Sequence, residues 1–464
     1  MSQRVDASTT TKFYSGTALM GALPELKDDT LGFVERMLDV YRDVVTFPIG
    51  PPGPLRIPMT LVMDPDGVEH VFGASTMAAF RKEGGFYREI RSFFGDGLLT
   101  SQDDDWRRQK RFVQPVFTHA RVEGYLAAMS REAGRSVDEL AGRVGSGWAE
   151  VDIGDAMAMM TLRIVGTALF GEDIDEVAPS VHAHVPVLQE AVTTRGRAAV
   201  PLPRSVPTPA NRRGNAAQTA LVDLCDEIVA RRRAGAAAGG RGDDLLGLLI
   251  DAHDGDEHLS DAEVREQVLV FLLAGHETTS MTLLCTLHLL AHHPEIQARV
   301  RDEVSAVLGD RDPTVDDVHS GLPVTSAVLK ESLRLYPAAP IIGRQAMTDD
   351  EICGQPVRGG TIVAVAPWAV HRRPDLWPDA SGFDPDRWLT GPQDRHRYAW
   401  LPFGGGPRAC IGQHFAVQEA TVALAMLVRA LSFAPRRGDS DVLDLLSQIT
   451  LSPRHPVRLV VTRA

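Results

Sequence analysis

Apolar residues recur at helical spacing over most of the chain. In residues 24–45 they return every three or four positions, so one face of a helix would be apolar. The same spacing predicts helices within residues 150–235, interrupted near Pro179 and by further prolines after it, and another over residues 412–420. The longest pattern runs from about residue 264 to 291 and predicts one long apolar helix.

Other stretches have the patterns of strands and loops. Residues 52–75 and 361–366 alternate as strands do, and residues 64–67 carry a turn signal. Residues 83–100 combine glycines with aromatic side chains, which predicts either a mobile loop with an apolar inner side or an ordinary surface loop with buried anchors. Residues 231–242 are rich in Arg, Ala and Gly and predict a flexible surface connection.

Composition narrows the class of protein. The chain has 464 residues, 44% hydrophobic and 23% charged, which suits a globular protein with a large core, and length alone would allow about three domains. A net charge of −13 argues against nucleic acid as a partner. The four cysteines are widely spaced and match no disulfide or zinc pattern, which suits a reducing cytosol.

The most distinctive stretch is the glycine-rich loop of residues 403–412. Its three glycines and a proline exclude an ordinary helix or strand, and a helical pattern follows Cys410. The amides and positive dipole at a helix start favour a thiolate, which is a soft ligand for iron. Phe403 can cover the loop, and Arg408 can pair with an anion beside the metal. The alternatives are a buried structural thiol and a dinucleotide loop, and too little chain remains for the second.

The long apolar helix has a polar interruption at its middle, residues 274–280. A glycine there costs about 1 kcal/mol relative to alanine, and burial of the acid Glu277 costs more. Residues that destabilise the middle of an apolar helix in this way indicate that the segment has a function. His288 and His292 are spaced as a metal-binding pair would be, but no third ligand of suitable spacing follows, so ordinary helix-face histidines are favoured.

These stretches together resemble the cytochromes P450. The haem-thiolate loop of that family has Phe, Gly, Arg, Cys and Gly at the spacing of Phe403, Gly404, Arg408, Cys410 and Gly412. The family pattern Ala/Gly-Gly-x-Asp/Glu-Thr is similar to residues 274–278. The resemblance implies the cytochrome P450 fold, mainly α with small β-sheets. We therefore predict an N-terminal extension of residues 1–29 and a single P450 domain of residues 30–464.

The resemblance implies a haem b group (iron protoporphyrin IX) with Cys410 as the axial ligand and Gly412 among the residues that bind the cofactor. Trp106, Lys110 and Arg344 would reach the haem propionates. Position 110 is lysine where the family often has arginine, and lysine offers a point charge rather than a bidentate fork. Arg111 is the alternative to Lys110 as the cation that reaches a propionate.

On the other side of the haem, Ala274 and Gly275 would leave room for O2, and Glu277 and Thr278 would deliver protons. The strand near Arg344 and a turn near residue 449 would border substrate. The expected substrate-pocket residues are Phe93, Leu98, Ala274, Ile341, Ile342 and Ile449.

Glu331 and Arg334 are three residues apart and share one face of a helix. A lone pair of this kind is usually a surface salt bridge worth under about 1 kcal/mol, but the flanking residues are apolar and argue for burial. The resemblance adds Arg387 and implies a buried network that supports the fold and haem incorporation.

The implied reaction inserts one oxygen atom from O2 into an organic substrate. No flavin or ferredoxin module follows the cysteine loop, so two electrons from NAD(P)H would arrive through a reductase and a ferredoxin. The basic cluster Arg107, Arg108, Lys110 and Arg111 predicts either a docking face for an acidic ferredoxin or a solvated helix face.

The expected pocket is mostly apolar, which favours a hydrophobic substrate such as a terpenoid of secondary metabolism, including antibiotic biosynthesis. A fatty acid or a polyketide is an alternative substrate, and a non-catalytic haem-binding sensor or carrier is an alternative class of protein. The polar N-terminus has no signal peptide, and no run of 18 apolar residues occurs in the sequence. We expect a cytoplasmic monomer without a membrane anchor.

Overall fold

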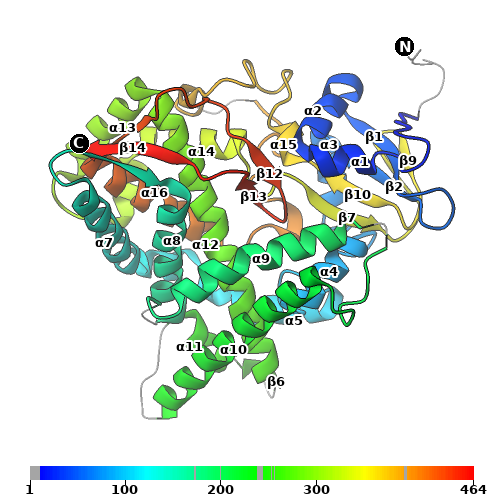
Figure 1. Ribbon diagram of the computed structural model, residues 1–464, viewed down its shortest axis with the longest axis horizontal. Coiled ribbons are helices and arrows are strands. Elements are labelled where there is room, and N and C mark those ends of the chain that lie inside the picture. The colour runs from blue at the N-terminus through cyan, green and yellow to red at the C-terminus, as the bar shows by residue number, and fades with distance from the viewer. Residues whose placement is uncertain are drawn as a thin grey trace.

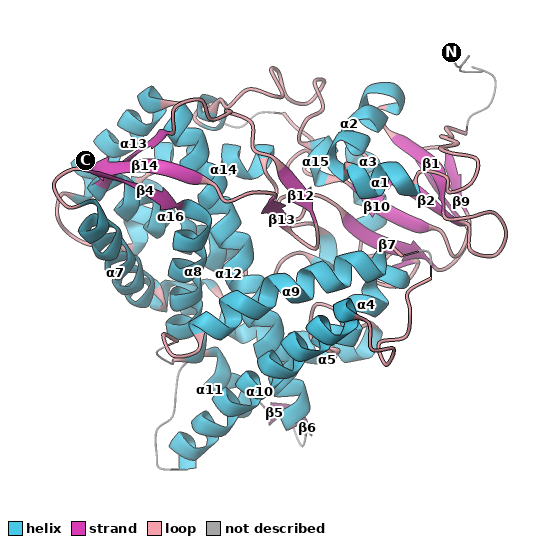
Figure 2. Ribbon diagram, in the orientation of Figure 1, coloured by secondary structure: helices cyan, strands magenta, loops and turns pink. Residues whose placement is uncertain are grey.

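The computed structural model describes residues 11–171, 174–198, 200–237, 244–251, 253–254, 257–390 and 394–464. Helices dominate these residues and the sheets are small (Figure 2), which confirms the predicted fold class.

The α-helices are α1 (Leu23–Asp28), α2 (Thr30–Tyr41), α3 (Pro65–Phe72), α4 (Gly85–Phe94), α5 (Asp103–Val113), α6 (His119–Gly124), α7 (Leu126–Val144), α8 (Ile153–Phe170), α9 (Ala178–Gly196), α10 (Pro209–Ala237), α11 (Leu245–Asp251), α12 (Asp261–His292), α13 (Pro294–Leu308), α14 (Pro323–Leu335), α15 (Pro367–Val370) and α16 (Gln413–Ala430). The strands are β1 (Val44–Ile49), β2 (Ile57–Val62), β3 (Phe80–Arg81), β4 (Trp148–Asp152), β5 (His253–Asp254), β6 (Glu257–His258), β7 (Ile342–Ala346), β8 (Asp350–Ile352), β9 (Gln355–Val357), β10 (Ile362–Val365), β11 (Leu431–Pro435), β12 (Leu445–Ser447), β13 (Leu451–Pro453) and β14 (Arg458–Arg463).

Figure 1 shows a helical body on one side of the molecule and a smaller β-rich part on the other. The main sheet of that part has the strand order β1-β2-β10-β7-β3. Strand β3 pairs with β7 so that Arg81 lies opposite Gln345. This register brings the residue after Arg81 close to Arg344, and it therefore shapes one end of the site described below.

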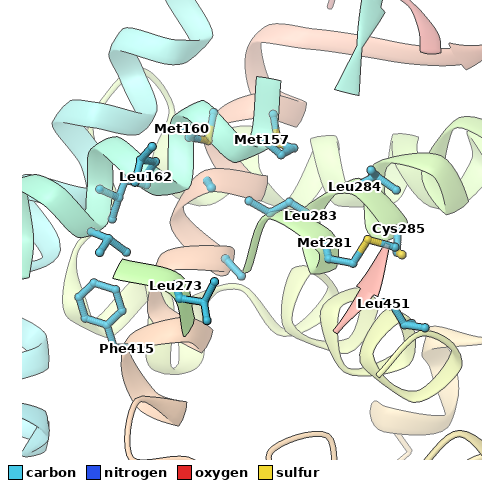
Figure 3. Packing of buried hydrophobic residues seen from close by; sticks show 14 of the residues in the cluster. Met157, Met160, Leu162, Leu273, Met281, Leu283, Leu284, Cys285, Phe415 and Leu451 are labelled. Atoms are coloured by element: carbon cyan, nitrogen blue, oxygen red, sulfur yellow. The ribbon is translucent and has the colours of Figure 1, made fainter. Parts of the chain in front are cut away.

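The long helix α12 forms the centre of the helical body. Ser260 caps its start: the Ser260 hydroxyl accepts from the Glu263 N–H, and the Glu263 carboxylate accepts from the Ser260 N–H at 2.8 Å. Most of its apolar side chains are buried. Figure 3 shows side chains of α8, α12 and α16 packed in one cluster, with Met157 and Leu284 among its members. The predicted long helix is confirmed.

Among the described residues, two helices, α8 and α12, are long and apolar enough to cross a membrane by length and composition. However, 61% of the apolar window in α8 and 72% of that in α12 are buried inside the fold. Both are accounted for as core helices.

The N-terminal prediction is correct only in part. The helix expected over residues 24–45 is divided into α1 and α2 at Asp29, whose carboxylate accepts from the Gly32 N–H at 2.9 Å and caps α2. The β-branched residues that follow form β1 instead of more helix. Part of the predicted extension packs on this strand, since the Tyr14 N–H donates to the Thr46 carbonyl at 3.0 Å. The boundary at residue 30 stays a prediction.

The turn signal at residues 64–67 marks the start of a helix. Asp64 accepts from the Asp66 N–H at 2.9 Å and caps α3, so the strand pattern of residues 52–75 holds for β2 but not beyond it. An aspartate that bonds to the backbone two residues ahead serves a turn and a helix cap equally well, and the sequence does not separate the two.

The loop predicted for residues 83–100 is wrong over its first half. Residues Gly85–Phe94 form α4, and glycines with positive φ lie at its two ends, Gly84 (96°) and Gly95 (77°). The aromatic residues between them form the buried face of a helix. The number of glycines in this stretch favoured a loop. Their positions show instead that they mark the two ends of a helix.

The predicted interruptions of residues 150–235 are observed. Pro179 lies in the first turn of α9, and residues 197–208 separate α9 from α10. The flexible connection predicted for residues 231–242 is helical as far as Ala237. Its remaining part, residues 238–242, lies outside the described residues.

Glu331, Arg334 and Arg387 meet in the interior. Arg334 Nη2 donates to Glu331 Oε1 at 2.8 Å, and Arg387 Nε donates to the same oxygen at 3.0 Å. The Glu331 and Arg334 side chains are fully buried. Arg334 also donates to three backbone carbonyls within residues 371–382. This network fastens α14 to the irregular segment that leads towards the glycine-rich loop.

Candidate active site

A cavity of about 420 Å³ lies between α12 and the glycine-rich loop of residues 403–412. Its walls include side chains from α4, α5, α9, β7 and the first turn of α16. All of the predicted catalytic, cofactor and substrate residues except one line it. They are Leu98, Trp106, Lys110, Ala274, Glu277, Thr278, Ile341, Ile342, Arg344, Phe403, Arg408, Cys410, Gly412 and Ile449.

Phe93 is the exception: it does not line this cavity, and its assignment to the substrate pocket stays a prediction. It lies on the buried face of α4 with 1% of its surface exposed, and the Arg204 guanidinium stacks on its ring at 3.9 Å. The helix turns this side chain towards α10. Phe86, Tyr87 and Ile90 of the same helix line the cavity instead.

The glycine-rich loop presents the Cys410 thiol to the cavity. The Cys410 N–H donates to the Phe403 carbonyl at 2.9 Å, which closes the loop. Gly406 has a φ of 66°, and a Cβ there would lie 1.8 Å from the Phe72 carbonyl oxygen, so no other residue fits. Helix α16 begins at Gln413 with Gly412 as its N-cap.

The protein environment alone does not make Cys410 a thiolate. Burial raises the pKa of the thiol, while the Gly412 N–H and the positive charge of Lys82 lower it, and burial is the larger effect. The sequence argument that the helix start favours a thiolate is therefore outweighed. A bound metal ion would supply the missing positive charge.

Positive side chains gather at one end of the cavity. Burial, together with the charges of Arg344 and Arg408, lowers the pKa of Lys82 well below its usual range. Burial also lowers the pKa of Arg408 to about 10. Arg408 Nη2 donates to the Ser101 carbonyl at 2.6 Å, but Arg408 Nη1 is buried and has no hydrogen-bond partner among the described residues. This end of the cavity is therefore built to hold an anion.

Lys82 is a site residue that sequence reasoning missed. It follows β3 directly and carries no local motif. Its ammonium reaches the cavity because β3 pairs with β7, and it donates to the Leu99 carbonyl at 3.0 Å. Only the long-range strand pairing places it near Arg344.

Trp106 and Lys110 support Arg408 rather than standing apart from it. The Arg408 guanidinium lies 4.2 Å from the centre of the Trp106 ring, and the Lys110 ammonium lies 5.0 Å from it. Lys110 also donates to the Pro407 carbonyl at 3.1 Å. These contacts fix the glycine-rich loop against α5.

The polar middle of α12 forms the cavity wall opposite the glycine-rich loop. The Thr278 hydroxyl donates back to the Ala274 carbonyl at 2.8 Å. Gly275 borders the cavity, but it is also small for a packing reason, since a Cβ there would lie 3.0 Å from Val165 Cγ2 on α8.

Glu277 is buried, and burial raises the pKa of its carboxyl to about 8. The side-chain amide of Gln189 on α9 donates to Glu277 Oε2. Sequence reasoning identified Glu277 from its motif but did not identify Gln189, because no local signal links residues so far apart.

A second buried acid, Glu419 on α16, was also missed. Its side chain is fully buried, and neither carboxylate oxygen has a hydrogen-bond partner among the described residues. Burial raises the pKa of Glu419 well above its usual range. Burial therefore favours the protonated form of this carboxyl.

The residues of the basic cluster of α5 have two different environments: some are exposed, and one pairs with α12. Arg107 is exposed and pairs with Asp104 at 2.6 Å on its own helix. Arg108 binds the Glu263 carboxylate at the start of α12 and the His258 carbonyl at 2.7 Å. Arg108 therefore anchors α5, and Arg107 and the exposed Arg111 remain candidates for a docking face.

The residues of the cavity fit a haem-thiolate group. A soft sulfur ligand lies at one wall, and an unpartnered guanidinium nitrogen lies among three cations at the end where two propionates would need them. The rest of the lining is largely apolar, as a porphyrin face requires.

Comparisons with known proteins agree with this arrangement. A family model described as Cytochrome P450 matches residues 16–460. The chain is 35% identical to cyclooctat-9-en-7-ol 5-monooxygenase of Streptomyces melanosporofaciens over 77% of this chain and 76% of the relative. It is 36% identical to pentalenene oxygenase of Streptomyces avermitilis over 75% of this chain and 76% of the relative. The crystal structure of the cytochrome P450DA heme domain has a TM-score of 0.84 and 29% identity over 98% of each chain.

Proposed function

The chain belongs to the cytochrome P450 family and is a monooxygenase of that family, and from this premise we propose that it holds haem b through Cys410 and oxidises a hydrophobic terpenoid. One observation carries the proposal. A single cavity combines the Cys410 thiol, a cationic end and an apolar wall that lies beside the polar middle of α12.

The apolar wall supports a hydrocarbon skeleton as the main part of the substrate. It includes Phe86, Leu98, Ile341 and Ile449. Two relatives are named for the oxidation of cyclooctat-9-en-7-ol and of pentalenene. The polar side chains on this side include the Gln189 amide, the Glu277 carboxyl and the hydroxyls of Thr278, Thr279, Thr282 and Thr450. They suit a neutral hydrocarbon or alcohol better than the carboxylate of a fatty acid.

When bound, haem b supplies the activation of O2, and the residues of this chain hold the group and its surroundings. Cys410 would bind the iron as a thiolate. Lys82, Arg344 and Arg408 would pair with the propionates, which satisfies the free nitrogen of Arg408.

Glu277 and Thr278 support proton delivery to the oxygen side of the cavity. Formation of product and water from O2, two electrons and substrate consumes two protons. Because the pKa of the buried Glu277 carboxyl lies at about 8, this carboxyl is protonated in most molecules at neutral pH. The Thr278 hydroxyl borders the same space and can position a water for transfer.

We infer that electrons come from NAD(P)H through a ferredoxin reductase and a ferredoxin, and that the protein works as a monomer in the cytoplasm. The exposed Arg107 and Arg111 of α5 support docking of an acidic protein.

The test is a spin-state titration of the ferric protein with cyclic terpene alcohols, the parent hydrocarbons and fatty acids of similar size. A terpenoid should shift the spin state and then yield a product that carries one atom from isotopically labelled O2. Ile449→Ser should weaken its binding about tenfold through lost apolar contact, whereas the matched surface change Val442→Ser should not. Binding of fatty acids alone would overturn the substrate class, and binding without turnover would favour a sensor or carrier.

A further inference from the structure

Gln189 of α9 connects three parts of the fold at the cavity wall. Its side-chain amide donates to Glu277 on α12 and, at 3.1 Å, to the Thr450 hydroxyl. Thr450 lies in the turn between β12 and β13. Gln189 is only 2% exposed, so these bonds form away from bulk water, where loss of a partner leaves a polar group unsatisfied.

The partner of Glu277 is neutral. No ion pair between Glu277 and a cation is found in the part of the chain that the structure describes, and the Gln189 amide donates to its carboxyl. A cation at this position would hold the carboxyl ionised, whereas an amide satisfies one oxygen and leaves the proton in place. Residue 189 therefore affects the direction of the carboxyl more than its charge.

We propose that Gln189 is a positioning residue that aims the Glu277 carboxyl into the cavity when α9 is packed against α4 and α10. This inference rests on the proposed function, because it takes Glu277 as the group that delivers protons. It adds a residue on a different helix, and it makes the geometry of the acid depend on the position of α9.

The construction of α9 gives this dependence a structural basis. Pro186 lies inside the helix one turn before Gln189, and it has no N–H to donate to the carbonyl of residue 182. Beyond this point α9 is held to α4 by the pair Arg195–Glu89 at 2.6 Å, and the Arg197 side chain just after the helix donates to the Ser447 carbonyl of β12. In Figure 1, α9 crosses in front of α12 and α4. The helix that covers the cavity thus also carries the residue that orients the acid.

The test replaces Gln189 with methionine, which has a similar shape and no hydrogen-bond donor. The matched control is Thr193→Val, one turn further on the same face of α9. Thr193 is 8% exposed, and its hydroxyl has no hydrogen-bond partner among the described residues, so the control removes a buried polar atom that orients nothing.

The first measurement needs no turnover. In the infrared spectrum of the ferric protein below neutral pH, the C=O band of Glu277 is assigned by its absence in Glu277→Gln. Loss of the bond from Gln189 should move this band to higher wavenumber in Gln189→Met and leave it in place in Thr193→Val. An unmoved band in Gln189→Met would overturn the proposal.

The second measurement is turnover with a substrate found by the spin-state titration. We expect Gln189→Met to form product roughly tenfold more slowly, with more peroxide per NAD(P)H and an unchanged substrate Kd, because a misdirected acid slows proton transfer and not binding. A raised Kd with an unmoved infrared band would make Gln189 a substrate contact and overturn the proposal. Full coupling in Glu277→Gln would instead contradict the proposed role of Glu277 itself.

Discussion

Glu277 and Thr278 are neighbours in sequence, but their side chains have different partners. The hydroxyl of Thr278 bonds within its own helix, and the carboxyl of Glu277 bonds across to α9. The two side chains can therefore be changed separately, and each change reports on a different step of proton delivery.

Thr278→Ala should keep haem and substrate binding but lose coupling. Without the hydroxyl the donor water loses this hydrogen bond, so product per NAD(P)H should fall and hydrogen peroxide should rise. The loss of one proton-transfer step typically costs about 10²–10⁴-fold in its rate. Product, peroxide and NAD(P)H are measured in one assay. Thr278→Ser, which retains the hydroxyl, should stay coupled, and full coupling in the alanine variant would rule out this role for Thr278.

Glu419 should make stability depend on pH. Burial raises the pKa of Glu419, so the folded protein keeps a proton that the unfolded chain releases near pH 4.3. The stabilising effect of that proton is complete below the unfolded pKa and is lost as the pH rises towards the folded pKa. Glu419→Gln removes the linkage, so its free energy of unfolding should rise relative to the wild type as the pH increases.

Urea unfolding at a series of pH values measures this difference. Glu419→Ala serves as the packing control, since it also leaves a cavity and should lower stability at every pH. Parallel curves for wild type and Glu419→Gln would show that the carboxyl is charged or solvated in the folded state.

At the residue scale, the sequence predicts side chains that belong to a local motif. Cys410, Arg408, Glu277 and Thr278 each sit in a short pattern whose residue types already limit the chemistry. Lys82 and Gln189 have no such pattern, because their places depend on strand pairing and helix packing between distant segments.

Helix α14 combines buried apolar side chains with a buried polar network. Arg334→Ala would leave Glu331 buried beside a partly broken network, which should cost about 3–5 kcal/mol and yield little haem-loaded soluble protein. The control is Arg299→Ala, which breaks an exposed pair with Asp386 and should cost under about 1 kcal/mol. Equal effects of the two substitutions on the free energy of unfolding would show that burial of the network adds nothing.

Helix α5 offers a matched pair of charge reversals. Arg107→Glu should slow reduction by the ferredoxin in a salt-dependent way and leave substrate affinity unchanged, because Arg107 is exposed. Arg108→Glu should instead lower the melting temperature, since it opposes Glu263 at the start of α12. Reduction rates at low salt that are unchanged in Arg107→Glu would remove it from the docking face.

At the element scale, periodicity predicts the long helices well and the β-rich part poorly. α12 has a long apolar pattern and a capping box, so its existence follows from the sequence. β1 and α4 were missed because six to ten residues give too few repeats, and because glycine marks helix ends as readily as loops.

At the scale of the whole molecule, the site is made where distant segments meet. Lys82 follows an edge strand, Glu277 lies in the central helix and Cys410 lies near the end of the chain, yet all three border one cavity. The family pattern predicts that α12 and the glycine-rich loop meet. The place of Lys82 does not follow from it, because it depends on the pairing of β3 with β7.

The most direct test of this account is the absorption spectrum of the reduced protein with carbon monoxide. The wild type should show the red-shifted Soret band of thiolate ligation, and Cys410→Ser should lose it. Cys285→Ser and Cys353→Ser, which change thiols outside the cavity, should keep it. Retention of the red-shifted band in Cys410→Ser would contradict the assignment of Cys410 as the haem ligand and the function built on it.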